Sequence, residues 1–285
     1  MTKCHIIVII ANDTAGTSRD LKNNKYLGGC KMSKNIIFYF SGTGNSLKVA
    51  KDIESAIQDC ELISMGKSHK LSGTYERIGF VYPIYGGGMP GAVERFVKKL
   101  DLLANTNSFI FAVCTSGSGS AGGLTNISKI IGGKGGKFSY GESIRCFSNY
   151  VGLYAMGSDA DNKAKAQSQA TKLVIKDIQS LAVKPPYKNN PMALLHGPFI
   201  KWLAKRDKGF NVSEACNGCS TCSKVCPVGN IKMQDGKPIF LHHCEQCMAC
   251  VQWCPKQSIN LKNKTQNRGR YHHPEITLAE MINPK

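Results

Sequence analysis

The chain has 285 residues, 42% of them apolar, so it can bury the core of one large or two modest domains. No stretch approaches the roughly 20 apolar residues that span a bilayer, and no cleavage site follows the short apolar run at 6–11, so we expect a soluble, cytoplasmic protein without a signal peptide. Thirteen cysteines, eight of them in two tight runs, exclude a spread disulfide scaffold and indicate metal in a reducing compartment.

The formal net charge is +18, and it is unevenly distributed. Residues 184–285 hold 15 of the 37 basic residues but only 6 of the 19 acidic ones. A positive field of this kind attracts acidic partners and offsets the negative charge of metal-bound thiolates. Nucleic-acid binding is the alternative, although the chain contains no recognition motif for it.

The first 33 residues differ from the rest in being rich in Asn, Lys, Thr and Gly. Gly28–Met32 is what a purine-rich ribosome-binding sequence would encode just before a start codon, which suggests that Met32 is the native start. An ordinary flexible extension is the alternative. We therefore assign residues 1–33 to an N-terminal extension, of which residues 1–31 would be upstream translation, absent from the native protein, if Met32 is the start.

Strands and helices alternate from residue 34 to residue 183. In chain order the periodicity predicts a strand at 36–40, a helix at 46–57, strands at 60–65 and 77–82, a helix at 91–103, a strand at 109–114, a helix at 124–131, a last strand and irregular segment over 137–156, and a helix over 159–183. This alternation predicts an α/β domain with a doubly wound parallel sheet covered on both faces.

The rest of the chain divides into three parts. Prolines and asparagines at 184–191 mark a linker, and together with a short helix at 192–206 it fills residues 184–210. Residues 211–262 form the cysteine-rich domain, for which a small α+β fold is expected. A polar tail at 263–285 follows.

The cysteine domain contains the same run twice, C-x2-C-x2-C-x3-C-P, starting at Cys216 and again at Cys244. This is the bacterial pattern for holding [4Fe–4S] clusters, and it resembles the two-cluster bacterial ferredoxins across about 50 residues. In such modules the fourth cysteine of each run serves the other cluster. The resemblance therefore implies two ligand sets: cluster I on Cys216, Cys219, Cys222 and Cys254, and cluster II on Cys226, Cys244, Cys247 and Cys250. Zinc is the alternative metal for four thiolates.

A loop rich in Gly, Ser and Thr joins the first strand to the first helix at 41–46. Backbone N–H groups, hydroxyls and the helix N-terminus together favour a phosphate. The loop lacks the lysine of a nucleoside-triphosphate-binding loop, and a simple helix-capping turn is the alternative.

This loop resembles the phosphate loop of flavodoxins, which bind FMN, and the order of the elements fits a flavodoxin-like fold. Two further loops at the carboxyl ends of strands, 83–90 and 115–119, correspond to the loops that hold the flavin ring in that family. The FMN-binding residues implied are Ser41, Thr43, Gly44, Asn45, Ser46, Pro83, Tyr85, Gly86, Thr115, Ser116 and Gly117. Tyr85 either stacks on the flavin or packs within its loop. Neither ring loop contains the acidic residues that many flavodoxins carry there.

The segment 117–122 also matches the dinucleotide-binding pattern G-x-G-x-x-G. That motif belongs after the first strand of a βαβ unit, whereas the strand before 117 is the fourth, so NAD is the weaker alternative to flavin. Cys114, just before this segment, is predicted to be a buried strand cysteine.

A flavodoxin-like domain followed by a two-cluster ferredoxin module resembles the flavodoxin–ferredoxin fusion proteins of anaerobic bacteria and archaea. Arg270–Pro274 looks like a C-terminal signature of these fusions, in which His272 and His273 either lie near a cofactor or clasp the tail. The resemblance implies an oxidoreductase that passes electrons between an external carrier, the clusters, FMN and an unidentified acceptor. The alternative is a non-enzymatic carrier. Expected partners are an acidic redox protein such as a ferredoxin, and a small-molecule acceptor.

Overall fold

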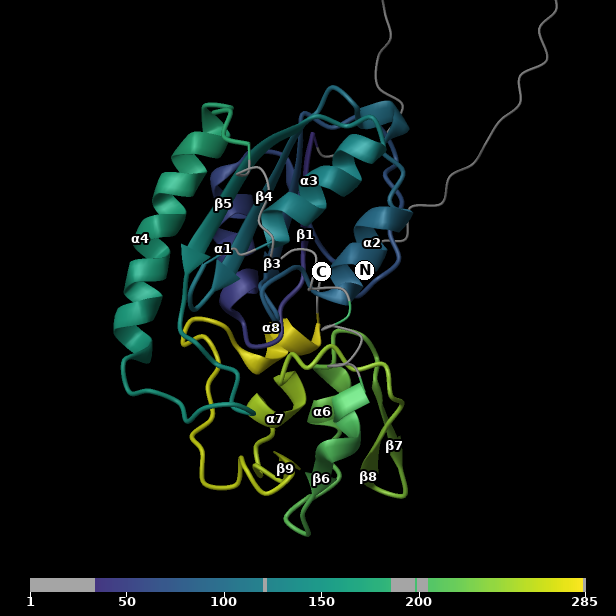
Figure 1. Ribbon diagram of the computed structural model, residues 1–285, viewed down its shortest axis with the longest axis vertical. Helices are drawn as coiled ribbons and strands as arrows, with labels where there is room; N and C mark the ends of the chain where they lie inside the picture. Colours follow the sequence, from purple (N-terminus) through teal and green to yellow (C-terminus); the bar gives the residue numbers. More distant parts are fainter. Residues whose placement is uncertain (1–33, 120–121, 186–197, 199–204, 284–285) are drawn as a thin grey trace, which may run out of the picture.

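The computed structural model describes residues 34–119, 122–185, 198 and 205–283 (Figure 1). The extension predicted at 1–33 lies outside these residues, as do most of the linker and of the short helix predicted at 192–206. Within the described part, no helix combines the length and apolar content needed to cross a bilayer.

A five-stranded sheet forms the centre of the N-terminal domain. Its strands are β1 (Asn35–Tyr39), β2 (Cys60–Ser64), β3 (Arg77–Pro83), β4 (Phe109–Ser116) and β5 (Phe138–Arg145). They lie in the order β2-β1-β3-β4-β5, and every pairing is parallel. The carboxyl ends of β1 and β3, where the winding reverses, therefore meet at one edge, beside that of β4. The predicted doubly wound, flavodoxin-like α/β fold is confirmed.

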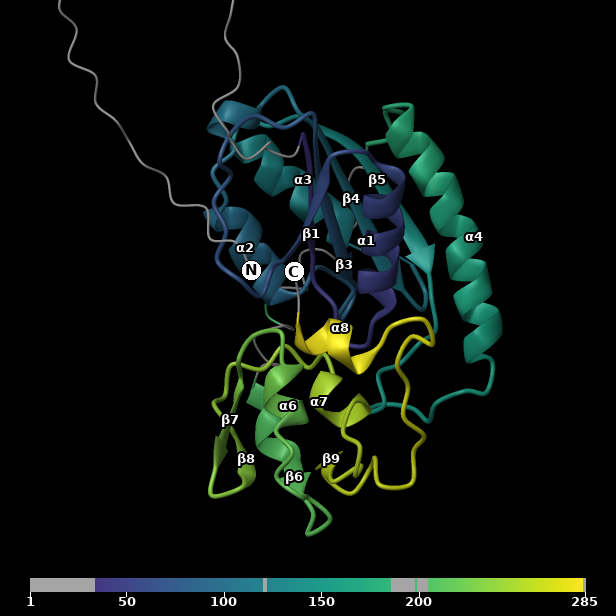
Figure 2. The same cartoon turned by 180° about the vertical axis from the view of Figure 1, so that it is seen from behind.

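Four helices cover the two faces of this sheet (Figures 1 and 2). Helices α1 (Asn45–Ala56) and α4 (Ala160–Gln179) pack together on one face, and α2 (Gly91–Lys99) and α3 (Gly123–Gly133) on the other. The central strand β1 is apolar at every position after Asn35 because its two faces bury different cores. Ile36 and Phe38 join the core under α2 and α3, whereas Ile37 and Tyr39 join the core under α1 and α4.

Three predicted elements are clearly shorter in the structure, and one of them is the helix expected over 159–183, which spans Ala160–Gln179 as α4. The helix expected over 91–103 ends at Lys99, because Leu100 takes an extended backbone conformation and buries its side chain in the core. The last strand expected within 137–156 ends at Arg145. The segment from Cys146 onward is a loop that crosses the carboxyl edge of the sheet, so its polar and aromatic side chains reach the other loops there.

The cysteine domain is small and internally repeated. It contains β6 (Phe210–Val212) paired with β9 (Ile259–Leu261), the hairpin β7 (Ile231–Gln234) and β8 (Lys237–Phe240), and two one-turn helices, α6 (Thr221–Lys224) and α7 (Ala249–Gln252). Left-handed backbone conformations recur 28 positions apart, at Gly218 and Gln246, Ser220 and Met248, and Gly229 and Gln257. The repeat in the sequence is thus a repeat in the backbone.

The two domains share one core. Val225, Ala249 and Trp253 of the cysteine domain belong to the same buried cluster as the residues of α1 and α4. The tail ends in α8 (Leu278–Ile282), whose N-terminus is fixed by a capping box at Thr277 and which lies between the domains in both views (Figures 1 and 2). Ile276 and Met281 add tail side chains to the shared core.

The packing within the sheet predicts the effect of one glycine substitution. A Cβ on Gly79 in β3 would lie 2.3 Å from the ring of Phe111 in β4, so Gly79→Ala forces a fully buried aromatic ring to move. We expect the free energy of unfolding to fall by about 1–3 kcal/mol. Denaturant unfolding followed by circular dichroism measures this change.

The matched control is Gly132→Ala in α3, where an added Cβ meets nothing within 4 Å. This variant should be stabilised by about 0.5–1 kcal/mol, since alanine favours a helix more than glycine does. Equal stabilities for the two variants would show that Phe111 does not constrain Gly79.

Candidate cofactor sites

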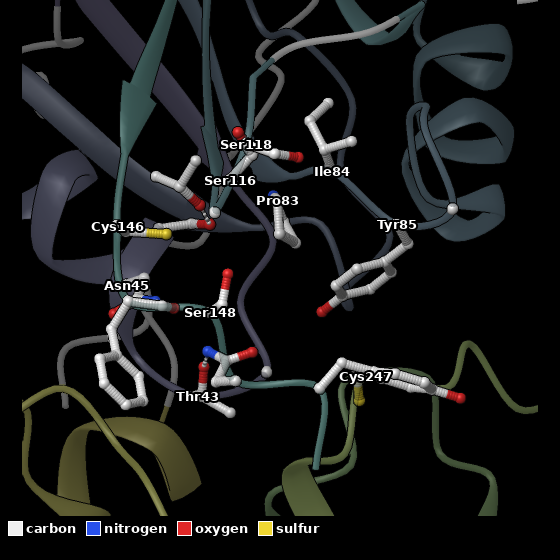
Figure 3. Close-up of a pocket in the computed structure, with 18 of the residues that line it drawn as sticks. Thr43, Asn45, Pro83, Ile84, Tyr85, Ser116, Ser118, Cys146, Ser148 and Cys247 are labelled. Atoms are coloured by element: carbon white, nitrogen blue, oxygen red, sulfur yellow. Dashed lines mark hydrogen bonds between the residues drawn. The ribbon is translucent and has the colours of Figure 1, made fainter. Parts of the chain in front are cut away.

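A cavity of about 500 Å³ opens at the carboxyl edge of the sheet, where the sheet domain faces the cysteine domain (Figure 3). It is lined by residues from the β1–α1 loop, the loops after β3, β4 and β5, and the cysteine domain. None of the residues that line it among those described is Asp, Glu, Lys, Arg or His. The cavity therefore offers hydroxyls, amides, backbone groups and aromatic rings, with no formal charge.

The β1–α1 loop presents the start of a helix to this cavity. Gly44 is the N-cap of α1, with φ of +98°, and supplies no side-chain cap. The first N–H groups of the helix therefore remain available to an anion. The Ser41 hydroxyl accepts a hydrogen bond from Gly44 N–H at 3.1 Å, and the Ser46 and Thr115 hydroxyls lie 2.8 Å apart. This arrangement fits a phosphate group.

The loops after β3 and β4 form the next two walls. Tyr85 and Gly88 exchange backbone hydrogen bonds across Gly86 and Gly87, both with positive φ, so the turn is tight and holds Tyr85 over the cavity. Figure 3 shows the Tyr85 hydroxyl directed into the cavity. On the β4 side, a Cβ on Gly117 would lie 1.7 Å from Ser148 Oγ, so only glycine fits there.

A fourth loop, following β5, contributes residues that sequence reasoning missed. Thr43 Oγ1 accepts a hydrogen bond from Asn149 at 2.6 Å, and the Phe147 carbonyl accepts one from Asn45 at 3.4 Å. The missed lining residues from this loop are Cys146, Phe147, Ser148, Asn149, Tyr150, Leu153 and Tyr154. The predicted topology could have identified this loop, because the carboxyl end of a fifth parallel strand lies at the same edge of the sheet as the others. Burial raises the pKa of the Cys146 thiol to about 12, so this thiol is neutral.

Of the eleven residues predicted to bind FMN, ten line the cavity and one does not. The exception is Gly44, whose Cβ position faces His273 and Ile276 of the tail at 3.0 and 3.1 Å. Gly44 faces the tail and not the cavity, because it is the residue at which the chain turns to begin α1. The Asn45 side chain lines the cavity but is committed to protein partners, since its amide donates to Phe147 and its oxygen accepts from Tyr271 at 2.6 Å.

The resemblance divides the eight clustered cysteines into a first set (Cys216, Cys219, Cys222 and Cys254) and a second set (Cys226, Cys244, Cys247 and Cys250). Besides burial, the charges of Cys254, Cys216 and Cys219 raise the pKa of Cys222, and those of Cys226 and Cys244 raise the pKa of Cys247. Among the described residues, no three His, Cys, Asp or Glu side chains form a set that could hold a single metal ion. The two ligand sets stay a prediction with which these interactions agree.

Backbone N–H groups surround these sulfurs in a repeated way. Cys226 Sγ accepts a hydrogen bond from Asn230 N–H at 3.2 Å, and Cys254 Sγ accepts one from Ser258 N–H at 3.4 Å, at equivalent positions of the two runs. Burial raises the pKa of the Cys244 thiol to about 12 and holds that of Cys247 well above its usual range. Metal-free thiols here are protonated, so metal binding displaces protons.

The cavity and the second cysteine set touch. Gln246 and Cys247 both line the cavity, and Cys247 lies near Tyr85 (Figure 3). A Cβ on Gly42 would lie 2.7 Å from the Cys247 carbonyl oxygen, so the β1–α1 loop and the cysteine loop meet backbone to backbone. The Gly42 carbonyl accepts a hydrogen bond from the Trp253 indole at 3.1 Å, which fixes this approach.

Comparison with known proteins matches two separate segments of the chain to families. Residues 36–130 match the family described as a flavodoxin domain, and residues 215–264 match the family described as a 4Fe-4S dicluster domain. The chain is a fusion of these two domains. The flavodoxin domain indicates FMN, and the dicluster domain indicates iron–sulfur clusters.

Among solved structures, the chain is similar to FMN-bound flavodoxin of Fusobacterium nucleatum, with 17% identity and a TM-score of 0.35 over 51% of this chain and 96% of that one. It is also similar to two-electron reduced flavodoxin of Megasphaera elsdenii, with 20% identity and a TM-score of 0.32 over 48% and 98%. One component of the ion-translocating oxidoreductase complex of Methanosarcina acetivorans is 38% identical over 61 residues. That match covers 20% of this chain and 23% of the relative.

The tail clasps the flavodoxin domain to the dicluster domain. Tyr271 stacks on Phe147 and donates to Asn45, His272 stacks on Trp253 with ring centroids 4.3 Å apart, and His273 N–H donates to the Thr43 carbonyl at 2.8 Å. These contacts are the ones expected if His272 and His273 clasp the tail to the rest of the protein. The same contacts brace the β1–α1 loop from behind.

The buried histidine of this clasp predicts a pH dependence. His273 is 1% exposed, its Nδ1 accepts from Glu275 N–H, and its Nε2 has no protein partner. Burial lowers its pKa below 6.5, with Glu275, Lys48 and Asp52 as the charged neighbours. The unfolded tail then binds more protons than the folded one, so the clasp is fully stable above pH 6.5 and weakens as pH falls through the lowered pKa.

Amide hydrogen exchange of residues 271–282, corrected for its intrinsic pH dependence, measures this weakening. His273→Gln should remove the pH response, because glutamine does not titrate. His272→Gln, which changes the exposed neighbour, should keep it. A pH response that survives in His273→Gln would assign the effect to another group.

Proposed function

We propose that this protein is an iron–sulfur flavoprotein oxidoreductase. In this proposal, FMN occupies the cavity of the flavodoxin domain, and the dicluster domain holds two [4Fe–4S] clusters on the two cysteine sets. Electrons from an external one-electron carrier pass through the clusters to the flavin and on to a small-molecule acceptor. When bound, FMN exchanges one or two electrons and each cluster exchanges one.

The observation that carries the proposal is the position of Cys247. This residue belongs to the second cysteine set and also lines the cavity. Tyr85 stands beside it, because a Cβ on Gly42 would lie 3.0 Å from Cys247 Cβ and 3.2 Å from the Tyr85 hydroxyl, and burial holds the pKa of the Tyr85 phenol well above its usual range. The proposed flavin site and the proposed site of the second cluster therefore adjoin at Cys247, with no helix or strand between them.

The remaining cavity residues have roles that follow from their chemistry. The N-terminus of α1 and the hydroxyls of Ser41, Thr43 and Ser46 would hold the phosphate. Gly117 and Ser148 would lie beside the flavin ring, at a position where a Cβ on Gly117 would meet the Ser148 side chain. Tyr85 would cover one side of that ring and exclude water from the wall shared with Cys247.

The loop after β5 favours an acceptor of small size. Leu153 and Tyr154 line the cavity but remain 70% and 38% exposed, so they form an apolar lip at its mouth. An apolar lip suits a partly apolar molecule that approaches the flavin from solvent. A pure electron carrier has no need of such an opening, and this is why the oxidoreductase is favoured over the carrier.

The cofactor assignment predicts a composition. Protein purified without oxygen should contain one FMN and about eight irons per chain, as two four-iron clusters require. Thr43→Arg should abolish flavin binding and leave the iron count unchanged, because the arginine side chain fills the phosphate end of the cavity. Flavin absorbance and iron analysis measure both quantities.

The matched control is Gln169→Arg, which adds the same side chain to an exposed position of α4. It should retain flavin and iron. An iron count near four would contradict the two-cluster assignment. A Thr43→Arg protein that stays yellow would show that the flavin binds elsewhere.

Turnover separates the oxidoreductase from the carrier. With a reduced acidic ferredoxin as donor and a small quinone such as menadione as acceptor, the wild-type protein should catalyse continuous reduction of the quinone, and Thr43→Arg should not. If the reduced wild-type protein were reoxidised only by another redox protein, never by a small acceptor, the carrier would be the correct assignment.

A further inference from the structure

The two cysteine sets differ in their exposure to solvent. In the second set, Cys250 is buried and Cys226, Cys244 and Cys247 are partly buried. In the first set, Cys219 is exposed, and its neighbour Lys224 ends the one-turn helix α6. The flavin cavity, the second cysteine set and the first cysteine set therefore follow one another in that order, and the first set reaches solvent at Cys219.

The loop that carries Cys219 lies against a turn of the domain. A Cβ on Gly218 would lie 3.1 Å from the Gly236 carbonyl at the tip of the β7–β8 hairpin, and Lys237 pairs with Glu214 at 3.5 Å. Figures 1 and 2 both place β6, β7, β8 and β9 at the end of the molecule remote from the five-stranded sheet. This end is open to a partner, whereas the opposite side is covered by the flavodoxin domain.

Burial makes this end more positive than its composition suggests. Between residues 208 and 264 the carboxylate of Glu245 is buried and paired with Arg95 at 2.7 Å, and Asp207, just before this range, is buried beside His242. The acidic residues left exposed in this range are Glu214 and Asp235. The exposed lysines outnumber them and are Lys208, Lys224, Lys232, Lys256, Lys262 and Lys264.

From this exposure and charge we infer that the face formed by Cys219 and the β7–β8 hairpin, bearing Lys232, is the docking site of an acidic one-electron carrier protein of the ferredoxin class. The inference rests on the proposed function, because it identifies the partner of the same redox chain. In each encounter the carrier is oxidised by one electron and this protein is reduced by one. No bond is made or broken, and two encounters load two electrons.

Neutral or basic partners do not fit this face, since the lysines would repel a cationic surface. Nucleic acid matches the sign of the charge but does not explain why an iron ligand is exposed among the lysines. A protein that exchanges electrons needs both features: complementary charge, which speeds the encounter, and a short path to the metal.

The test measures the second-order rate at which a reduced acidic ferredoxin reduces this protein, by anaerobic stopped-flow absorbance. Lys232→Glu should lower this rate about tenfold at low ionic strength, and added salt should lower the wild-type rate and shrink the difference. The control Lys172→Glu makes the same change at an exposed position of α4 in the flavodoxin domain, and should change the rate less than about twofold.

Chemical reduction by dithionite distinguishes this inference from the proposed function. All three proteins should have clusters and flavin reduced by dithionite at equal rates. If dithionite reduced the clusters but never the flavin, the proposed function would fail. If dithionite reduced both, while ferredoxin reduced all three proteins at one salt-independent rate, the docking site would be wrong. Duplex DNA binding that Lys232→Glu abolishes, with an unchanged ferredoxin rate, would assign the face to nucleic acid instead.

Discussion

The close backbone approach between Gly42 and Cys247 is the constraint on which the rest of the structure depends. No side chain fits on Gly42, because its Cβ would lie 2.7 Å from the Cys247 carbonyl. The Trp253 indole holds the Gly42 carbonyl from one side, and the tail braces Thr43 and Asn45 from the other. The phosphate-type loop of one domain and the metal-binding loop of the other are therefore one rigid site, and the shared hydrophobic core makes separation of the domains costly.

Charged side chains are distributed unevenly between the cavity and the outer face of the dicluster domain. The described residues that line the cavity are uncharged, so none of them repels an anionic group, and two carboxylates of the cysteine-domain region, Glu245 and Asp207, are buried and paired. The positive charge is left on the outer face of the dicluster domain. Such a separation keeps the flavin site neutral while the partner-facing end retains a long-range field.

Much of the fold was predictable from sequence because local patterns and the final structure agree. The apolar strand Ile36–Phe40, the Gly-rich loop after it and the repeated cysteine runs each specify their element without outside help. The loop after β5 was not predictable as a set of contacts, since Cys146 and Asn149 carry no motif and act only through their place at the sheet edge. The approach of Cys247 to Gly42 depends on how two domains pack, and no periodicity in either segment encodes it.

The most direct measurement is an anaerobic crystal structure of the loaded protein, with iron located by anomalous scattering. The account predicts a flavin in the cavity between Tyr85 and the loop after β4, and two groups of iron. One iron group should lie behind Cys247 beside the flavin, and the other at Cys219 near the surface. A flavin bound elsewhere, or iron separated from it by a whole domain, would contradict the account.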